Sequence, residues 1–184
     1  MREVELKSVA EDVPAARRSI EKAGGILTFE GALTDLRYGD AGGRLLASDL
    51  VLRLRVYDRD GEREGFLDWK GPTSYENGYK IREELSTSVG DPETLAHIIE
   101  NLGLTVIRRI DRQIAQYRLG GAVIRFEHYP HMDDLVEVEG SPEEIERGIA
   151  AIGLPREGFN SDRLPDFMAR FEARTGQKAL VASE

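Results

Sequence analysis

The chain lacks cysteine altogether. Disulfide bonds and thiolate metal sites are therefore excluded, and any metal ion must be held by oxygen or imidazole ligands. Histidine is also scarce, because only His97, His128 and His131 occur, and none of them has the spacing of a zinc motif. No segment approaches the roughly 18 apolar residues that cross a bilayer. The opening residues 1–5 do not form a signal peptide, so we expect a cytoplasmic protein that does not insert into membranes.

An excess of positive charge is absent as well. The 34 acidic residues outnumber the 25 basic ones and give a formal net charge of −9. Proteins that bind nucleic acids usually present a net basic surface, so a nucleic acid is not an expected partner. Net charge averages over the whole chain, however, and a basic site can lie inside an acidic protein.

The order of predicted elements favours an α+β fold in one domain of residues 1–184. Capping residues, helical apolar spacing and glycine exits predict four helices, at about 12–24, 91–103, 141–153 and 161–176. Eight strands are expected around them, at roughly 2–8, 26–38, 50–58, 64–70, 78–88, 105–118, 121–128 and 134–140. Hairpin connections indicate an antiparallel sheet or barrel within about 1–140, followed by C-terminal helices at 141–176. The tail at 178–184 is expected to fray.

The predicted strands carry charges of both signs on one face. Side chains alternate across a strand, so residues i and i+2 share a face. Glu3, Glu5 and Lys7 share one face of the first strand, and Arg53 and Arg55 share one face of the third. The same pattern occurs at 68–70, 80–84, 125–127 and 137–139. One such strand would be an ordinary half-buried strand with a wet outer face. Six of them predict an eight-stranded antiparallel β-barrel, with apolar rows under flanking helices and charges inside.

Charges confined inside a barrel must be paired or neutralised by a ligand. The basic side chains suit a polyphosphate, because guanidinium groups match phosphate oxygens; they are Lys7, Arg53, Arg55, Lys70, Lys80, Arg82 and Arg125. The acidic side chains would repel that ligand unless divalent cations intervene; they are Glu3, Glu5, Glu127, Glu137 and Glu139. A triphosphate bound together with Mg²⁺ or Mn²⁺ satisfies both sets.

These residues resemble the motifs of the CYTH proteins, the triphosphate tunnel metalloenzymes. The segment at 3–7 resembles their Glu-x-Glu-x-Lys signature, and the remaining motifs follow in order. They are the Leu-Arg-x-Arg strand at 52–55, the Lys-Gly-Pro turn at 70–72, the Arg-Glu-Glu strand at 82–84, and the closing acidic strands at 125–127 and 135–139. The resemblance covers about residues 1–140 and is strongest to the class IV adenylate cyclases of the CyaB type.

The resemblance implies an eight-stranded tunnel, often dimeric, that acts on triphosphates with Mg²⁺ or Mn²⁺. A homodimer is therefore one expected state. The implied metal ligands are Glu3, Glu5, Glu127, Glu137 and Glu139. The implied triphosphate ligands are Lys7, Arg53, Arg55, Lys70, Lys80, Arg82 and Arg112, and the implied catalytic residues are Glu5, Lys7 and Glu137.

The chain also departs from the pattern of this family. Glu127 stands where the family usually has aspartate, and the loop at 128–134 replaces a glycine-rich loop. A basic tunnel residue is expected near Arg109 or Arg112, and Arg112 is preferred. His128 and His131 are expected to be loop residues, with contact to a nucleobase as the alternative.

Two reactions fit the same set of charges. A cyclase would convert ATP into cyclic AMP and pyrophosphate, and the resemblance favours this reading. A triphosphatase would hydrolyse tripolyphosphate, thiamine triphosphate or nucleoside triphosphates. A third reading is a module that binds a polyphosphate or nucleotide without turnover. Because all three use the same barrel-lining charges, the sequence does not decide among them.

Overall fold

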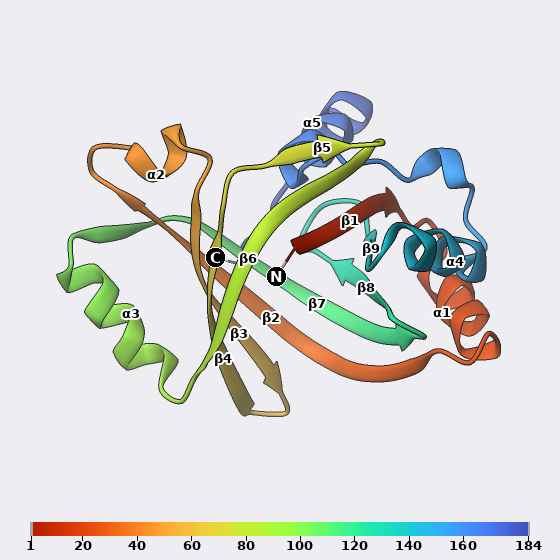
Figure 1. Ribbon diagram of the computed structural model, residues 1–184, viewed down its shortest axis with the longest axis horizontal. Helices are drawn as coiled ribbons and strands as arrows, with labels where there is room; N and C mark the ends of the chain where they lie inside the picture. Colours follow the sequence, from red (N-terminus) through yellow and green to blue (C-terminus); the bar gives the residue numbers. More distant parts are fainter. Residues whose placement is uncertain (1, 184) are drawn as a thin grey trace.

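The barrel is built from long antiparallel strands. The computed structural model describes residues 2–183, and for Arg2 and Glu3 we use the backbone alone. Within this range the strands are β1 (Arg2–Val9), β2 (Ile26–Asp40), β3 (Val51–Arg59), β4 (Glu62–Lys70), β5 (Ser74–Glu76), β6 (Tyr79–Val89), β7 (Leu104–Leu119), β8 (Ala122–His128) and β9 (Leu135–Glu139). β2 and β7 run side by side across the whole molecule (Figure 1).

Eight of these strands close into a ring. The order is β1-β9-β8-β7-β2-β3-β4-β6, and β6 pairs back onto β1. Every pairing in the ring is antiparallel. The short β5 pairs with β6 outside the ring. The predicted eight-stranded antiparallel barrel is thus confirmed, and all eight predicted strands correspond to strands of the ring.

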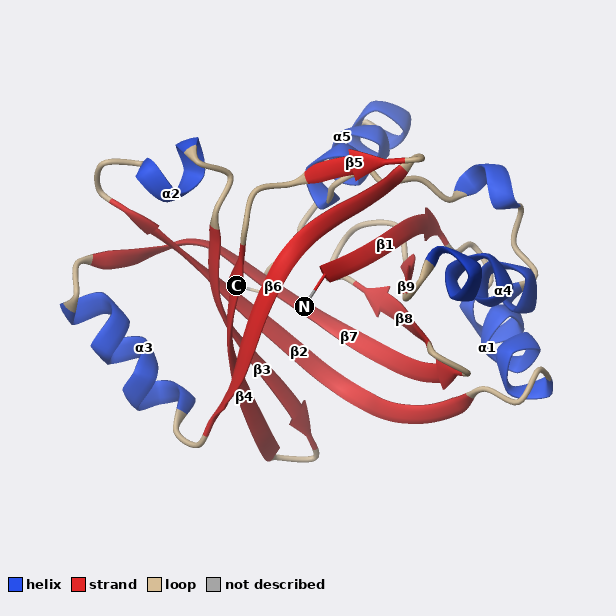
Figure 2. Cartoon of the chain, viewed as in Figure 1, coloured by secondary structure: helices blue, strands red, loops and turns tan. Residues whose placement is uncertain are grey.

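The first three predicted helices begin at the expected caps, and the fourth begins after Arg163 rather than near Ser161. They are α1 (Val13–Lys22), α3 (Pro92–Asn101), α4 (Pro142–Ile152) and α5 (Leu164–Thr175). Asp12 accepts the backbone N–H of Ala15 at 2.9 Å, and Asp91 does the same for Thr94. The helix α4 begins with a reciprocal capping box between Ser141 and Glu144. All of these helices lie outside the ring of strands (Figure 2).

The apolar faces of the strands are covered by the helices. α1 and α4 pack over β1, β8 and β9, where Leu6, Ile124 and Val138 are fully buried. α3 covers part of β3 through Leu54 and Ile99. Because side chains alternate along a strand, this outward packing directs the charged rows into the barrel.

Three short elements and the C-terminal tail differ from the prediction. The helix α2 (Arg44–Ala47), the strand β5 and the 3₁₀ helix at Arg156–Gly158 had no clear signal. The tail does not fray: Val181 accepts the backbone N–H of Asp111 at 2.7 Å, and Leu180 pairs with His131. Ala179 is buried beside Val181 in the same cluster as α5. The apolar character of this tail outweighs its position near the end of the chain.

None of the helices within residues 2–183 is both long enough and apolar enough to cross a membrane.

Candidate functional site

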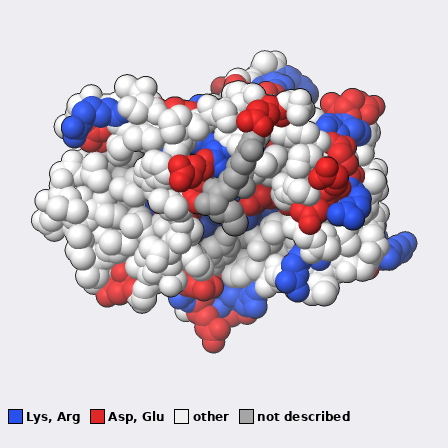
Figure 3. Space-filling view, in the orientation of Figure 1, with Lys and Arg blue, Asp and Glu red and all other residues white. Residues whose placement is uncertain are grey.

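The barrel encloses a cavity of about 860 Å³ lined by charged side chains from most of the ring. Each predicted site residue whose side chain is described lines it, namely Glu5, Lys7, Arg53, Arg55, Lys70, Lys80, Arg82, Arg112, Glu127, Glu137 and Glu139. The side chain of Glu3 lies outside the described part of the structure. Acidic and basic side chains also lie next to each other near the middle of the face in Figure 3. The structure thus gathers residues from distant motifs, while their roles as ligands stay predictions.

One wall of the cavity, formed by β1, β8 and β9, carries the carboxylates. Lys7 lies directly opposite Glu137 in the β1–β9 pair, and their side chains form an ion pair. Arg125 on β8 donates to the other oxygen of Glu137 at 2.8 Å. Glu5 is paired with Lys80 across the β1–β6 seam. The carboxylates of this wall are therefore held by cations of the protein itself.

The electrostatics keep Glu137 and Lys7 ionised. Burial would raise the pKa of Glu137, but the charges of Lys7 and Arg125 hold it well below its usual range. Burial would lower the pKa of Lys7, but Glu137 and Glu5 hold it well above its usual range. The site therefore contains hard anionic oxygens at neutral pH.

The opposite wall, formed by β2, β3 and β7, carries a cluster of arginines around Asp35. Arg55 donates to both oxygens of Asp35, at 2.8 and 3.1 Å, and Arg112 donates at 3.0 Å. Arg53 contacts Asp35 at 3.4 Å and donates to Asp68 at 2.6 Å. Burial would raise the pKa of Asp35, but Arg53, Arg55 and Arg112 hold it well below its usual range. Asp35 was not predicted, because its only signal is an acidic residue inside a predicted strand.

Glu127 joins the two walls. Arg112 donates to one of its oxygens at 2.9 Å, and the Tyr129 hydroxyl donates to the other at 2.7 Å. Burial would raise the pKa of Glu127, but Arg112 and Lys7 lower it. Tyr129 was not predicted, because it lies beyond the end of β8 in a loop.

The Lys-Gly-Pro turn lies near one mouth of the cavity. Lys70 forms an ion pair with Glu84 at 3.2 Å. Arg82 is buried and donates to the backbone carbonyl of Gly71 at 2.7 Å and to that of Asp49. Arg82 therefore holds this turn in place as well as lining the cavity.

The donor chemistry of the acidic wall fits a hard divalent cation. Carboxylate oxygens are the ligands that Mg²⁺ and Mn²⁺ prefer, and Glu5, Glu137 and Glu139 all line the cavity. Among the side chains that the structure describes, no three acidic or histidine residues form a ready cation cluster. Lys7 forms an ion pair with Glu137, and Lys80 forms one with Glu5. These lysines must therefore move before a cation can bind the two carboxylates.

The choice of Arg112 over Arg109 agrees with the geometry. Arg112 is buried and lines the cavity, whereas Arg109 is exposed and pairs with Asp111 outside. His131 lies in the loop at 129–134 and His128 lies directly before it, and neither lines the cavity. His128 contacts Asp134 at 2.6 Å, and His131 contacts Gln177.

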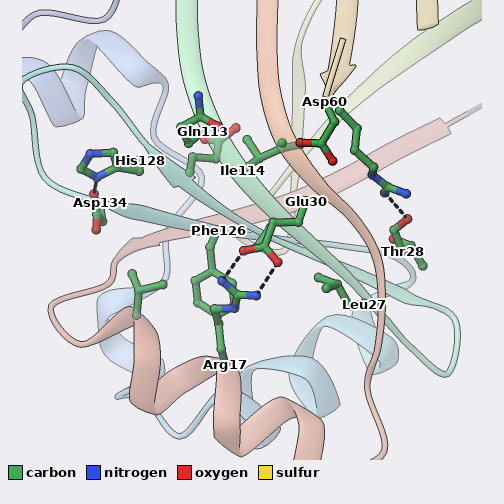
Figure 4. A pocket seen from close by; sticks show the side chains of 15 residues that line it. Arg17, Leu27, Thr28, Glu30, Asp60, Gln113, Ile114, Phe126, His128 and Asp134 are labelled. Atoms are coloured by element: carbon green, nitrogen blue, oxygen red, sulfur yellow. Dashed lines mark hydrogen bonds and ion pairs between the residues drawn. The ribbon is translucent and has the colours of Figure 1, made fainter. Parts of the chain in front are cut away.

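A second hollow of about 650 Å³ lies outside the barrel, between α1 and strands β2, β7 and β8. Figure 4 shows Arg17 of α1 reaching Glu30 of β2, and the two form a bidentate ion pair at 2.8 and 3.0 Å. Of the predicted site residues, Glu127 alone lines this hollow. Its main charged contact, the pair of Arg17 and Glu30, is partly exposed, so we place the candidate site inside the barrel.

No protein-family model matches the chain, and no curated protein matches its sequence. Solved structures do match its fold. A Vibrio parahaemolyticus protein described as a "putative adenylate cyclase" has a TM-score of 0.76 and 18% identity, covering 91% of this chain and 97% of its own. A Pyrococcus horikoshii protein gives a TM-score of 0.74 and 20% identity, covering 91% and 98%.

A third solved structure is similar over the full chain. It comes from Hippeastrum, is described as a "putative adenylyl cyclase" with a dominant triphosphatase activity, and gives a TM-score of 0.63 with 16% identity. The match covers 100% of this chain and 99% of the other. These likenesses show that the chain has the fold of these proteins, the eight-stranded tunnel that the resemblance to CYTH proteins predicts.

Proposed function

We propose that this protein is a metal-dependent enzyme that acts on a nucleoside triphosphate held in its tunnel, and that it converts ATP into cyclic AMP and pyrophosphate. The observation that carries the proposal is the enclosure of an acidic wall and a basic wall in one cavity. A polyphosphate alone would suit the basic wall and be repelled by the acidic one. A polyphosphate with its divalent cation suits both.

The phosphates would bind to the basic wall. Arg55, Arg112 and Arg53 are already oriented by Asp35, so they do not need to be ordered when the ligand arrives. Bidentate arginine–phosphate pairs would then share the guanidinium groups with Asp35. Burial in the barrel makes these contacts stronger than they would be in water.

The acidic wall would hold the cation, with Glu5 and Glu137 as ligands and Glu127 and Glu139 beside them. When bound, a divalent cation neutralises charge on the phosphates and lowers the pKa of a hydroxyl group that attacks phosphorus. Lys7 and Lys80, displaced from Glu137 and Glu5, are then free to donate to phosphate oxygens. Catalysis of this kind rests on positioning and charge neutralisation, without a dedicated base.

The apolar part of the cavity favours a nucleotide over bare tripolyphosphate. One mouth is lined by Leu46, Leu50, Val51 and Leu85 in addition to charges. Leu46 is 71% exposed and Leu85 is 56% exposed, so they present apolar surface to a ligand. A nucleoside offers a matching surface, and inorganic tripolyphosphate does not.

The named neighbours favour two reactions. The Vibrio protein described as a "putative adenylate cyclase" supports the cyclase reading. The triphosphatase activity named for the Hippeastrum protein, which matches this chain along its whole length, supports hydrolysis of the triphosphate as the second candidate.

Product analysis distinguishes these candidates. The purified protein is incubated with ATP, and separately with tripolyphosphate, with Mg²⁺ or Mn²⁺, and the products are separated by chromatography. Cyclic AMP with pyrophosphate is the expected result. Release of orthophosphate without cyclic AMP would contradict the cyclase activity and support a triphosphatase activity. If neither compound is turned over, the proposed enzymatic activity is contradicted, and a module that binds the ligand without turnover remains.

A further inference from the structure

Three arginines lie in one row across neighbouring strands near the apolar mouth of the tunnel. Arg37 of β2 is directly opposite Arg108 of β7 on one side and Arg53 of β3 on the other. Arg37 and Arg108 both line the cavity and are half-buried. Like charges directly opposite each other in an antiparallel pair destabilise a sheet, so this row has a cost that the fold does not need.

The arginines of this row differ in their partners. Arg53 is held by Asp68 and Asp35. Arg37 and Arg108 make no hydrogen bond or ion pair with any residue that the structure describes. Burial lowers the pKa of Arg37, and the charges of Arg108 and Arg53 lower it further. Two cavity-lining guanidinium groups therefore have their donors available for an anion.

The backbone next to the pair of arginines is irregular. The β2–β7 register shifts between Arg37 and Tyr38, so that Ile107 is an extra residue on β7. A bulge of this kind redirects the side chains beside it. A Cβ at Gly39 would lie 2.7 Å from the Ile107 side chain, so the bulged residue packs closely against Gly39.

The Arg108 end of the pair lies apart from the paired interior, whereas Arg37 is next to Arg53. Arg108 is four residues from Arg112 along β7, which corresponds to about 13 Å along an extended strand. Arg112 is the arginine that joins Asp35 to Glu127. Between the two lies Ile110, which also lines the cavity and carries no charge. A ligand that reaches both places must be longer than one phosphoryl group.

We propose that Arg37 and Arg108 form a separate anion subsite that binds the phosphoryl group nearest the mouth and so selects triphosphates over diphosphates. This inference rests on the proposed binding of a triphosphate in the tunnel. In a nucleotide, the phosphoryl group bound here is the one that carries the nucleoside, because Leu46 and Leu50 line the same mouth. A diphosphate fills the deeper positions at Arg53, Arg55 and Arg112 and leaves the pair without a ligand.

Calorimetric titration with Mg²⁺ tests the proposal, and imido analogues of tripolyphosphate and pyrophosphate are used because they resist turnover. The two analogues are titrated separately into the wild-type protein and into the Arg37→Gln and Arg108→Gln variants. Each substitution is expected to weaken tripolyphosphate binding about 10-fold or more, since it removes a charged hydrogen bond. Pyrophosphate affinity is expected to stay within about 2-fold, because its ligands are unchanged.

Arg109→Gln is the matched control, because Arg109 is next to Arg108 but points out of the barrel and pairs with Asp111. It removes the same net charge and is expected to leave both affinities unchanged. Arg37→Lys, which keeps the charge, is expected to recover part of the tripolyphosphate affinity. Thermal unfolding is measured for each variant. The melting temperatures of Arg37→Gln and Arg108→Gln should be equal to that of the wild type or higher, because like-charge repulsion is relieved.

Three results would overturn the inference. If neither variant changes tripolyphosphate binding, the pair is not a subsite. If both ligands weaken equally, the pair contributes only to the general field of the tunnel. In both situations the proposed function stands, provided that the wild-type protein binds tripolyphosphate. If the wild-type protein binds neither compound, the proposed triphosphate site and this inference fail together.

Discussion

The interior of the tunnel and its apolar mouth use the same residue, arginine, in opposite ways. In the interior, Arg55 and Arg112 converge on Asp35; Asp35 and Arg112 are buried, and the Arg55 side chain is 11% exposed. At the mouth, Arg37 and Arg108 face each other, and neither forms an ion pair with a carboxylate among the described residues. A fully buried charge must be paired within the protein, whereas a half-buried charge is still hydrated and needs no partner until a ligand binds. The difference separates arginines that also hold the barrel together from arginines whose main partner is the ligand.

The strongest test of this comparison removes the carboxylate of the interior. Asp35→Asn leaves Arg53, Arg55 and Arg112 without their shared anion, and uncompensated buried charge is strongly destabilising. We expect the free energy of unfolding at pH 7 to fall by about 3–5 kcal/mol, measured by urea denaturation. Asp60→Asn, at an exposed hairpin tip, is the control and should change it by less than about 0.5 kcal/mol. Equal effects of the two substitutions would contradict a structural role for Asp35.

The acidic wall should control turnover rather than affinity for phosphate. Glu137→Gln removes a proposed cation ligand with little change of shape. Since a cation supplies several kcal/mol of stabilisation to the transition state, metal-dependent turnover should fall at least about 100-fold. Steady-state assays with Mg²⁺ or Mn²⁺ measure this loss, with the exposed Glu143→Gln as control. Full activity of Glu137→Gln would remove Glu137 from the site.

Removing the Lys70 side chain is expected to have an intermediate effect, on tripolyphosphate affinity. Lys70→Ala removes a cation that lines the cavity and pairs with Glu84. Tripolyphosphate binding should weaken about 10-fold, measured by calorimetry. Lys22→Ala, on the exposed side of α1, should have no effect. An unchanged affinity in Lys70→Ala would show that Lys70 does not contact the ligand.

The smallest expected effect is a pH dependence that the interior has and the mouth lacks. The pKa of Asp35 is lower in the folded protein than the unfolded value near 4, because the charges of three arginines outweigh its burial. The stabilisation from Asp35 is therefore complete above about pH 4 and is lost as the pH falls toward the folded pKa. The difference in unfolding free energy between wild type and Asp35→Asn should shrink below pH 4. A difference that is constant down to pH 2 would contradict this linkage.

Much of the fold could be predicted because its signals are local. Asp12, Asp91 and Ser141 cap their helices as expected. The β3–β4 hairpin turns at Asp60 and Gly61, both with positive φ, as an Asp-Gly pair predicts. The alternation of charged and apolar residues along the strands predicted which face lines the barrel.

The missing site residues depend on information that is not local. Asp35 and Arg37 lie on a strand where apolar and polar residues do not alternate cleanly, so the sequence did not indicate their direction. Arg108 and Arg109 are adjacent, and the cross-strand register together with the bulge at Ile107 decides which of them faces the cavity. The packed tail at 179–181 depends on contacts with β7 and with the loop after β8. Strand register and long-range contacts of this kind are not encoded within a short window of sequence.

The most direct test of the account is a crystal structure of the protein with Mn²⁺ and a non-hydrolysable ATP analogue, with Mn²⁺ located by its anomalous scattering. The account predicts an anomalous peak that contacts carboxylate oxygens of Glu5 and Glu137. It also predicts phosphate oxygens at Arg53, Arg55 and Arg112, with the phosphoryl group nearest the nucleoside at Arg37 and Arg108. A manganese peak away from Glu137, or an analogue bound outside the barrel, would contradict it.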